Sequence, residues 1–456
     1  MPEFLDAFVS EIERKRGRFK QLLSKGVSSP LDKDLQKLMQ TNWRSLPDIE
    51  PDGEQSLPPK AIAVDGSRAS RFLAVGSTLY VVRSLAICGK RRFRRLESDV
   101  LASRADVRDI SRYIDRKSEW IEHAVARDAI EGMAENGCEF LLIDGSFHAR
   151  LMALPRDMPQ EGQRGFMIDY FREYLGLLEV CRERRIAPVG VSKDSRVTFL
   201  RDHFLKMLLE EELKALKLSK EDDREIRQTF EEIIHRRRGK RVKRFTRLES
   251  KYGSGKLDRV IQILLEARML RSDHQMILNF TTSEGYSTPL ELGAFGRGGE
   301  LLDTYCREPR EYVSRHFPEA VDEAADPESF IDESANVLSM IPSFPTIVSF
   351  HMRLDKRDTP LRLDVPSWVF GIDRSLKDLS GFSPISHDNI EGIVSALRRL
   401  FGGITHYNIL LTSVDTEVRL KRDTVDRIYV PLLEKSLQLQ LPLPQVRGYR
   451  RGWYAR

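Results

Sequence analysis

The sequence has little cysteine and no long apolar run, and both absences narrow the possible classes of protein. Its four cysteines, Cys88, Cys138, Cys181 and Cys306, include no CxxC pair. This spacing argues against a zinc knuckle and against a disulfide framework, and it favours a reducing cytoplasm. No stretch reaches the roughly 20 uncharged apolar residues that a membrane span needs. The N-terminal segment also lacks the apolar region of a secretory signal, so we expect a cytoplasmic protein with no membrane contact.

The chain also lacks a strong net charge and the phosphate-binding loop of the common ATPases. Its 74 Lys and Arg residues oppose 69 Asp and Glu residues, and the resulting net charge of +5 names no partner by itself. Because no GxxxxGK[ST] motif is present, the chain does not supply the usual P-loop motor. The mean hydropathy of -0.40 is typical of a soluble globular protein. A length of 456 residues allows one elaborated core or two to three domains.

Apolar patterns predict two strand-containing parts that are separated by a helical one. Residues 1–25 are expected to form an amphipathic helix, and a Pro-rich connector follows it up to residue 60. Strands are expected at 61–64, at 140–143, after 186, and at 344–354, 361–370 and 407–415. Helices are expected at about 115–136, 168–184, 388–401 and 421–437, and residues 197–280 are strongly charged and helical throughout. The interleaving of strands and helices predicts an α/β architecture with a mixed sheet.

These changes in composition and in predicted secondary structure divide the chain into four segments. The first, residues 1–60, holds the N-terminal helix and connector, and the second, residues 61–196, is the first part of the core. Residues 197–285 are interpreted as a long helical insertion. Residues 286–456 complete the core and end in a basic, aromatic tail.

Two of the apolar strands are each followed by Asp-Gly-Ser, at 61–67 and at 140–146. A strand that ends in Asp and Gly places a carboxylate at the edge of the sheet, where Gly permits a tight turn and the close approach of a ligand. If the two strands are neighbours, Asp65 and Asp144 lie on one rim. Divalent cations such as Mg²⁺ are held by oxygen ligands of this kind. The alternative is that Asp-Gly is ordinary turn chemistry.

The helix expected between the two motifs supplies candidates for a third acid. In a projection at about 100° per residue, Asp128 and Glu131 fall on the apolar arc that contains Trp120 and Val125. An acid on a buried face needs an ionic partner or a metal. Asp128 is therefore the first candidate and Glu131 the second, whereas Glu122 projects to the other side and is expected to be solvated. A salt bridge from Asp128 to an arginine is the alternative.

The order of these motifs resembles that of the NurA nuclease family. The matching segments are AIAVDGSR (61–68), LLIDGSF (141–147), GVSKDSR (190–196), RLDVP (362–366) and YNILLTSVD (407–415). The resemblance implies an RNase H-like fold, a mixed sheet flanked by helices, into which the long helical insertion is placed. It also implies a two-metal site, and the positions that match are Asp65, Asp144, Tyr407 and Asp415. The helix acid is usually Glu and the last ligand is often His, so Asp128 and Asp415 depart from the family pattern.

The resemblance implies a metal-dependent DNA nuclease that uses Mn²⁺ or Mg²⁺. It would cleave DNA during end resection as a 5'-3' exonuclease, a single-strand endonuclease, or both. In such sites one ion activates the attacking water and the other stabilises the leaving oxygen. We assign Asp65 as the bridging ligand, and Asp128, Asp144 and Asp415 as the remaining ligands. Tyr407 is expected to orient a water or a phosphate. Lys193 is expected to contact the phosphate, unless it is merely solvated.

The resemblance further implies a homodimer that works with a hexameric HerA-type ATPase. A catalytically silent scaffold subunit that binds nucleic acid and regulates such a motor is the alternative from another functional class, and an RNA-directed nuclease of the same fold is a third. Positive charge that could contact phosphates gathers at 90–95, which is expected at a hairpin tip, and in the tail at 447–456, where aromatic residues could stack on bases. The densest run, for which a solvated helix face is the alternative, contains Arg236, Arg237, Arg238, Lys240, Arg241, Lys243 and Arg244.

Overall fold

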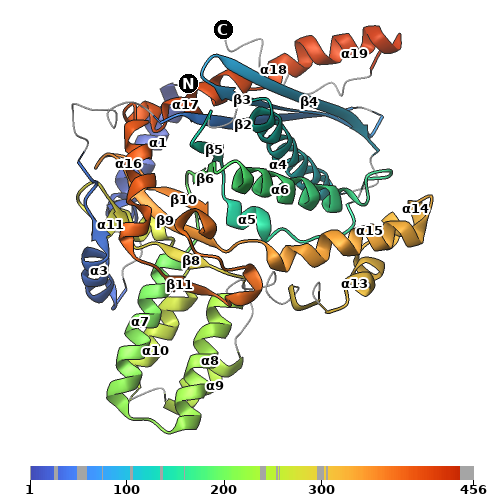
Figure 1. Cartoon of the computed structure of the whole chain (residues 1–456). Helices are drawn as coiled ribbons and strands as arrows, with labels where there is room; N and C mark the ends of the chain where they lie inside the picture. Colours follow the sequence, from blue (N-terminus) through green and yellow to red (C-terminus); the bar gives the residue numbers. More distant parts are fainter. Residues whose placement is uncertain are drawn as a thin grey trace.

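A large mixed sheet lies at the centre of the molecule (Figure 1). The computed structural model describes residues 2–24, 29–48, 59–73, 75–102, 106–133, 137–158, 160–236, 243–252, 255, 257–294, 302–304 and 307–441. Within these ranges the main path of the sheet has the strand order β1-β7-β9-β10-β6-β5-β2-β3-β4, and β8 joins β11 to β9. The α/β class with a mixed sheet flanked by helices is therefore confirmed.

The strands are short at one end of the sheet and long at the other. Their bounds are β1 (Trp43–Arg44), β2 (Ala61–Phe72), β3 (Thr78–Cys88), β4 (Arg91–Leu101), β5 (Phe140–Asp144), β6 (Ala187–Ser192), β7 (Gly285–Ser287), β8 (Leu290–Leu292), β9 (Ile347–Arg353), β10 (Leu361–Pro366) and β11 (Phe382–Pro384). Strands β2, β5 and β6 run parallel, and β3, β4, β9 and β10 pair antiparallel with their neighbours. Parallel strands that are covered on both faces read as continuous apolar runs, as Leu141–Ile143 of β5 do.

Helices precede, connect and follow these strands. The first part of the chain contains α1 (Pro2–Arg14), α2 (Arg16–Ser24), α3 (Asp32–Thr41), α4 (Val107–Glu131), α5 (Phe147–Leu151) and α6 (Phe166–Glu183). The middle contains α7 (Phe199–Leu216), α8 (Lys220–Arg236), α9 (Lys243–Tyr252), α10 (Asp258–Arg268) and α11 (Asp273–Phe280). The last part contains α13 (Pro309–His316), α14 (Pro318–Glu323), α15 (Pro327–Met340), α16 (Glu391–Arg399), α17 (Ile409–Val418), α18 (Arg422–Thr424) and α19 (Val430–Leu437). Among the described helices, none combines the length and apolar character that a membrane-spanning segment requires.

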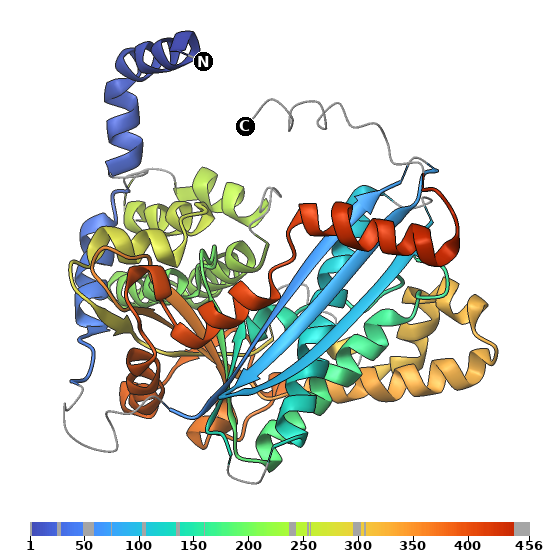
Figure 2. The same ribbon diagram turned by 90° about the horizontal axis from the view of Figure 1, so that it is seen from above.

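Helices cover both faces of the long strands β2 and β3, whereas β4, at the edge of the sheet, is largely exposed. Val64 and Val82 pack with Ile121 of α4 on one face, together with residues of α6. Ala63 and Leu85 pack with residues of α17 on the other. Because successive side chains of a strand point to opposite faces, β2 presents its side chains alternately to α4 and to α17. Figure 2 shows α17, α18 and α19 crossing the long strands on the face away from α4.

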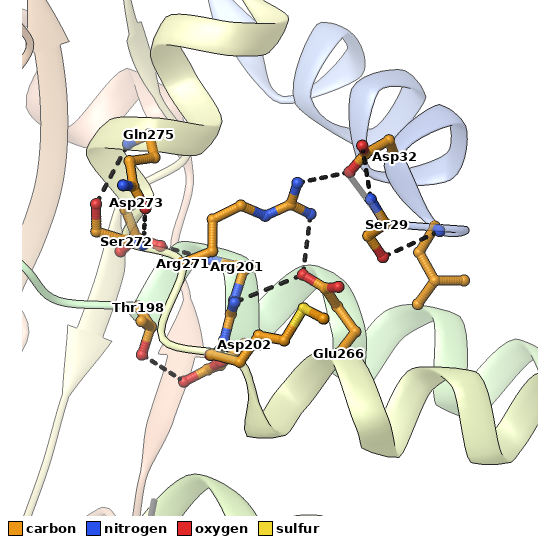
Figure 3. A network of polar contacts seen from close by, with 12 residues as sticks. Ser29, Asp32, Thr198, Arg201, Asp202, Glu266, Arg271, Ser272, Asp273 and Gln275 are labelled. Atoms are coloured by element: carbon orange, nitrogen blue, oxygen red, sulfur yellow. Dashed lines mark hydrogen bonds and ion pairs between the residues drawn. The ribbon is translucent and has the colours of Figure 1, made fainter. Parts of the chain in front are cut away.

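Helices α7 to α11 form a region with an apolar cluster of its own, which includes Phe204 and Ile263 and also Leu35 of α3. A buried polar network joins α7, α10 and α11 of this region to α3 (Figure 3). In it, the carboxylate of Glu266 accepts a hydrogen bond from Arg271 at 2.9 Å, and Arg271 also donates to Asp32 of α3 at 2.5 Å. The helical region is thus tied by apolar and ionic contacts to the N-terminal part of the chain. The helical character expected for 197–280 is confirmed for the described residues of this range.

Several other expected elements are confirmed, and some differ. Strands β5, β6, β9 and β10 and helices α4, α6 and α16 lie where the patterns placed them, although α4 starts earlier and β10 ends at Pro366. The single N-terminal helix is instead two helices, α1 and α2. The sequence patterns did not predict the short strands β7, β8 and β11, because three-residue strands carry no periodic signal. They also did not predict the helices α13, α14 and α15.

The strand expected at 407–415 is wrong, because this segment forms helix α17. Asn408 caps the helix by accepting hydrogen bonds from the backbone N–H groups of Leu410 and Leu411. The buried residues Val414 and Val418 then follow Leu411 at helical spacing. A short apolar run does not by itself distinguish a strand from a buried helix, and the capping asparagine was the signal that decides between them.

Candidate active site

The aspartates of the two Asp-Gly-Ser motifs are brought together by parallel pairing of their strands. In the register of β2 and β5, Val64 lies opposite Ile143, so Asp65 and Asp144 follow at the same level. β5 ends at Asp144. The negative charge of Asp144 contributes to the raised pKa of Asp65. The expectation that these strands are neighbours is confirmed.

The second Asp-Gly-Ser motif forms the expected turn after its strand. Gly145 has a φ of +119°, a conformation that favours glycine. Ser146 then caps α5, since its Oγ accepts a hydrogen bond from the backbone N–H of Ala149 at 3.0 Å. The same hydroxyl donates to Asp364 of β10 at 2.5 Å, and Asp364 is fully buried in an ion pair with Arg362. The turn that carries Asp144 is therefore fixed from the neighbouring strand β10.

The first motif forms no turn, which corrects the expectation that its strand ends at Asp65. β2 continues through Asp65, Gly66 and Ser67 to Phe72, paired with β3 throughout. Glycine at position 66 has a different explanation, because a Cβ there would overlap Oε1 of Glu122 and displace the carboxylate. Glu122 of α4 is thus packed directly against β2, beside Asp65.

The expectation that Glu122 is solvated is wrong, because only 7% of it is exposed. Helix α4 is buried on most of its circumference, since it lies between the strands β2, β3 and β4 and helix α6. A projection that assigns one buried face to a helix fails for a helix that is covered on two sides. The polar residues of α4 that the fold buries are Lys117, Ser118, Glu122 and His123.

The acids that the sequence placed on the buried arc of α4 lie elsewhere. The carboxylate of Asp128 accepts hydrogen bonds from Nε and Nη2 of Arg95 on β4, at 2.5 and 2.7 Å. Glu131 has an exposed side chain, 3.8 Å from Arg127. Neither acid is among the charges that raise the pKa of Asp65. Asp128 follows Glu122 by six residues, roughly 9 Å along a helix, so the arginine partner that was considered as an alternative is the one observed.

Asp65 lies at the centre of a group of acids. Burial, and next the charges of Glu122, Asp144 and Asp415, raise its pKa to about 8. Burial also raises the pKa of Glu122 to about 7, although the guanidinium of Arg150 opposes this effect. Three carboxylates, from α4, β5 and α17, therefore influence the partly buried carboxylate of Asp65 on β2.

Lys193 and Tyr407 lie beside this group of acids. Nζ of Lys193 is 2.9 Å from Oδ2 of Asp144, and it lies 4.4 Å from the centroid of the Tyr407 ring. Burial opposes the charge of Lys193, but Asp144 and Tyr407 outweigh it and raise the lysine pKa. Burial, and next the charge of Asp144, raise the pKa of Tyr407. Both side chains thus stay protonated near the carboxylates.

Among the described residues, the four acids outnumber the cations that contact them. Arg150 pairs with Glu122 at 2.5 Å and Lys193 pairs with Asp144 at 2.9 Å. Across the described residues, no three His, Cys, Asp or Glu side chains converge closely enough to hold a metal ion as they stand. The donors are nevertheless all oxygens in a partly buried, anion-rich position, which is the chemistry that Mg²⁺ and Mn²⁺ favour. The donor chemistry therefore suits a hard divalent cation, and the ammonium group of Lys193 occupies one of these oxygens, Oδ2 of Asp144.

The basic segments are only partly described. Residues 237–242, with Arg237, Arg238, Lys240 and Arg241, and the tail at 447–456 lie outside the described residues. Arg236 ends α8, Lys243 begins α9, and Arg244 is exposed and donates to Gln228 at 2.9 Å. The run at 90–95 extends along β4 rather than forming the hairpin tip alone. Arg92 and Arg94 of this run bind Glu417 of α17 at 3.0 Å.

Comparison with known proteins gives one family and several solved structures. No curated protein matches the chain. The chain is 14% identical to the NurA nuclease from Sulfolobus solfataricus, with a TM-score of 0.48, over 96% of this chain and 98% of that one. A structure of NurA bound to dAMP and manganese is also 14% identical, with a TM-score of 0.43, over 92% and 97% of the two chains. The family model of the NurA domain matches residues 59–420. Since this match covers most of the sequence, the chain belongs to the NurA family of nucleases.

Proposed function

We propose that this protein is a divalent-metal-dependent DNA nuclease whose active site contains Asp65, Glu122, Asp144 and Asp415. The observation that carries the proposal is the position of Asp65. Its carboxylate is partly buried on β2 among three other acids, each of which raises its pKa. Such an arrangement is unfavourable for folding alone, and groups whose pKa values are strongly perturbed cluster at functional sites.

Each acid has a role that follows from its place. Asp65 is central and is assigned as the bridging ligand, with Asp144 and Asp415 as ligands on either side. Glu122 takes the role of the helix acid in place of Asp128, because it is packed against Gly66 while Asp128 is held by Arg95. Two divalent ions held by these oxygens would lower the pKa of the attacking water and stabilise the leaving oxygen. Mn²⁺ and Mg²⁺ both suit such donors, and the family favours Mn²⁺.

Lys193 and Tyr407 are proposed to act on the phosphate. The ammonium group of Lys193 lies at Asp144, and a positive charge beside a developing negative charge stabilises a transition state. Tyr407 lies against Lys193 and is assigned to orient that ammonium group and a phosphate oxygen. Arg244 and its neighbours in the 236–244 run are proposed to contact phosphates of longer substrates.

Partners and cellular role are proposed on the family alone. Because the chain has no P-loop, movement along DNA would need a separate motor, and a hexameric HerA-type ATPase is the proposed partner. We propose a homodimer that resects DNA ends in the cytoplasm as a 5'-3' exonuclease, a single-strand endonuclease, or both. The four segments with boundaries after residues 60, 196 and 285 are kept as the proposed organisation, with the helical insertion apart from the nuclease core.

The test is cleavage of end-labelled single-stranded and double-stranded DNA with Mn²⁺, Mg²⁺ or EDTA, with and without a HerA-type ATPase. We expect cleavage that EDTA abolishes and that Asp65→Ala and Asp144→Ala remove. Asp99→Ala is a matched control, since Asp99 is an exposed acid on β4. Cleavage in EDTA, or wild-type rates in both site variants, would overturn the metal-site assignment. DNA binding without cleavage under any of these conditions would support the silent scaffold instead.

A further inference from the structure

Arg150 is a buried cation that connects the two acidic segments of the site. Its Nη2 donates to Oε2 of Glu122 at 2.5 Å and to the backbone oxygen of Asp144 at 3.1 Å. Its Nη1 lies 2.7 Å from Nε2 of His123, and only 4% of the residue is exposed. One guanidinium therefore spans α4 and the end of β5.

The contacts of Arg150 leave one oxygen of Glu122 available. Arg150 holds Oε2, whereas Oε1 faces Gly66, next to Asp65. A carboxylate whose one oxygen is fixed by an arginine keeps its other oxygen in a defined direction, because the planar guanidinium has a rigid donor geometry. Oε2 of Glu122 thus binds Arg150, while Oε1 is directed toward Gly66 and the neighbouring Asp65.

His123 is the third group that contacts the guanidinium of Arg150. A guanidinium is always charged in proteins, so Nε2 of His123 accepts the hydrogen bond and the imidazole is neutral. Burial, and next the charge of Arg150, lower the histidine pKa far below its usual range, in agreement with that state. The ring stacks on Tyr174 with centroids 4.7 Å apart. The contact with His123, whose ring is held by Tyr174, therefore helps to fix the direction of the guanidinium.

We propose that Arg150 is the positioning residue of the metal site, which aims Glu122 at Asp65 and thereby sets the affinity for the divalent cation. The proposal rests on the proposed function of the same carboxylates. Residues that hold a metal ligand in this way change metal affinity by about 10-fold to 100-fold when they are replaced. Arg150 itself touches neither the ion nor the DNA.

The experiment is a titration of Mn²⁺ into the DNA-free protein, followed by the electron paramagnetic resonance signal of free Mn²⁺. We expect Arg150→Met to weaken binding by about 10-fold or more, and Arg150→Lys, which keeps the charge but not the two-directional donor geometry, to weaken it less. Arg95→Met is the matched control, since it breaks another arginine–carboxylate contact of α4, with Asp128, at the same 2.5 Å distance. The control is expected to retain wild-type affinity.

A double variant separates a positioning role from a structural one. If Arg150 acts through Glu122, Arg150→Met in a Glu122→Gln background causes little further loss of affinity, and the effects are not additive. Unchanged affinity in folded Arg150→Met, or fully additive effects, would overturn the proposal. Should Arg150→Met not fold, Arg150→Lys decides, and wild-type Mn²⁺ affinity in folded Arg150→Lys would overturn the proposal. If the wild type itself binds no Mn²⁺, the proposed function fails, which is a different result from wild-type binding that Arg150→Met leaves intact.

Cys88 and Cys138 form a separate feature, which the active site does not use. Their Sγ atoms lie 3.0 Å apart, although the residues are 50 positions apart in the chain. Cys88 ends β3 and is half-buried, while Cys138 precedes β5 and is buried. A disulfide needs a separation of about 2.05 Å, so the two sulfur atoms are close enough to bond after a small movement.

We infer that Cys88 and Cys138 are a thiol pair that low-molecular-weight disulfides convert into an internal disulfide. The Cys88 thiolate attacks one sulfur of oxidised glutathione and releases one glutathione. Cys138 then loses its proton and attacks the Cys88 sulfur of the mixed disulfide, which releases the second glutathione and leaves the protein disulfide. The contact with Cys138 lowers the pKa of Cys88 to about 7, which favours Cys88 as the first nucleophile.

The test is incubation of the reduced protein with oxidised glutathione, followed by alkylation under denaturing conditions and peptide mass spectrometry. We expect one cross-linked peptide pair that joins positions 88 and 138, and a higher melting temperature that dithiothreitol reverses, because the bond closes a long loop. Cys181→Ser is the matched control and should behave like the wild type, whereas Cys88→Ser should not form the link. Both positions remaining separately alkylated in the wild type would overturn the inference.

Discussion

Oε1 of Glu122 occupies the space beside Cα of Gly66 that a Cβ atom would fill in any other residue. The contact joins the helix acid to the strand that carries Asp65. Gly66 does not have the positive φ that favours glycine elsewhere in the chain. The glycine of the first Asp-Gly-Ser motif is thus explained by the close approach of a carboxylate and not by backbone conformation.

Gly66→Ala is expected to displace Glu122 and reduce cleavage strongly, by at least 10-fold, since misplacement by about 1 Å can cost a factor of roughly 100. The measurement is the initial rate on labelled DNA at saturating Mn²⁺, with circular dichroism to confirm folding. Gly392→Ala is the control, because Gly392 is exposed on α16 with no atom near the added Cβ. It should leave the rate unchanged, and stabilise the helix by up to about 1 kcal/mol. A wild-type rate in Gly66→Ala would argue against Glu122 as a site acid.

Glu122→Gln and Asp128→Asn distinguish the acid favoured by the structure from the one favoured by the sequence. We expect Glu122→Gln to lose Mn²⁺-dependent cleavage, because it removes a charge from the acidic centre. Asp128→Asn should retain it, since Asp128 faces Arg95 at the side of β4. The lost ion pair is partly exposed and should cost at most about 1 kcal/mol. The opposite pattern of rates would restore Asp128 as the third ligand.

The part of the site that could be predicted from the sequence is the part that local patterns determine. Asp65 and Asp144 each follow a short apolar run, and parallel pairing of the strands that contain these runs places them together. Glu122 was missed because α4 is covered by both the sheet and α6, so its buried residues do not fall on one arc. Asp415 was placed on the wrong kind of element for a related reason, since the apolar run before it packs on β2 as a helix. The periodicity of a segment does not show how many of its faces the tertiary fold will cover.

Metal-free stability should depend on pH through Asp65. An aspartate in the unfolded chain titrates near pH 3.9, whereas burial and neighbouring acids raise the pKa of Asp65 to about 8 in the folded chain. Between those values the folded state retains a proton that the unfolded state releases, so the contribution to stability falls as the pH rises from about 4 to 8. Asp65→Asn stays neutral and avoids this loss. In EDTA, we expect its melting temperature to exceed that of the wild type by more at pH 8 than at pH 5.

The contribution of Asp65 is tested by thermal unfolding at both pH values. Glu417→Gln is a suitable control, because its contacts with Arg92 and Arg94 lower the pKa of Glu417 instead of raising it. This variant should not gain stability relative to the wild type as the pH rises. A difference between Asp65→Asn and the wild type that is the same at pH 5 and pH 8 would contradict the raised pKa.

Lys193→Met is expected to separate metal binding from turnover. Nζ of Lys193 contacts Oδ2 of Asp144, so a cation that binds Asp144 competes with it. Removing the ammonium group should therefore strengthen Mn²⁺ binding, while turnover at saturating Mn²⁺ falls because a positive charge near the phosphate is lost. Measuring the rate over a range of Mn²⁺ concentrations gives both quantities. A parallel loss of Mn²⁺ affinity and turnover would instead indicate that Lys193 only supports the fold.

The helical region should depend for its stability on Glu266, which contacts two buried arginines (Figure 3). Oε1 of Glu266 lies 2.9 Å from Nη2 of Arg271 and 3.5 Å from Nη1 of Arg201, and its side chain is 1% exposed. Breaking a buried ion pair from one side leaves uncompensated charge, at a cost of about 3–5 kcal/mol. Glu266→Ala is therefore expected to destabilise α10 and its contact with α3. Hydrogen exchange of α3 and α10 amides, which should become faster, is the direct measurement.

Glu210→Ala is the control for this prediction, because the ion pair of Glu210 with Arg227 lies in the same helical region but is about one-third exposed. Exposed pairs contribute at most about 1 kcal/mol, so exchange in α3 and α10 should hardly change. Glu266→Gln keeps an acceptor for Arg271 but loses the charge, and should fall between the two. Since the network lies among α3, α7, α10 and α11 and contains none of the four site acids, folded Glu266→Gln should cleave DNA at the wild-type rate. Equal exchange in Glu266→Ala and Glu210→Ala would show that the buried charges contribute no more than the exposed pair.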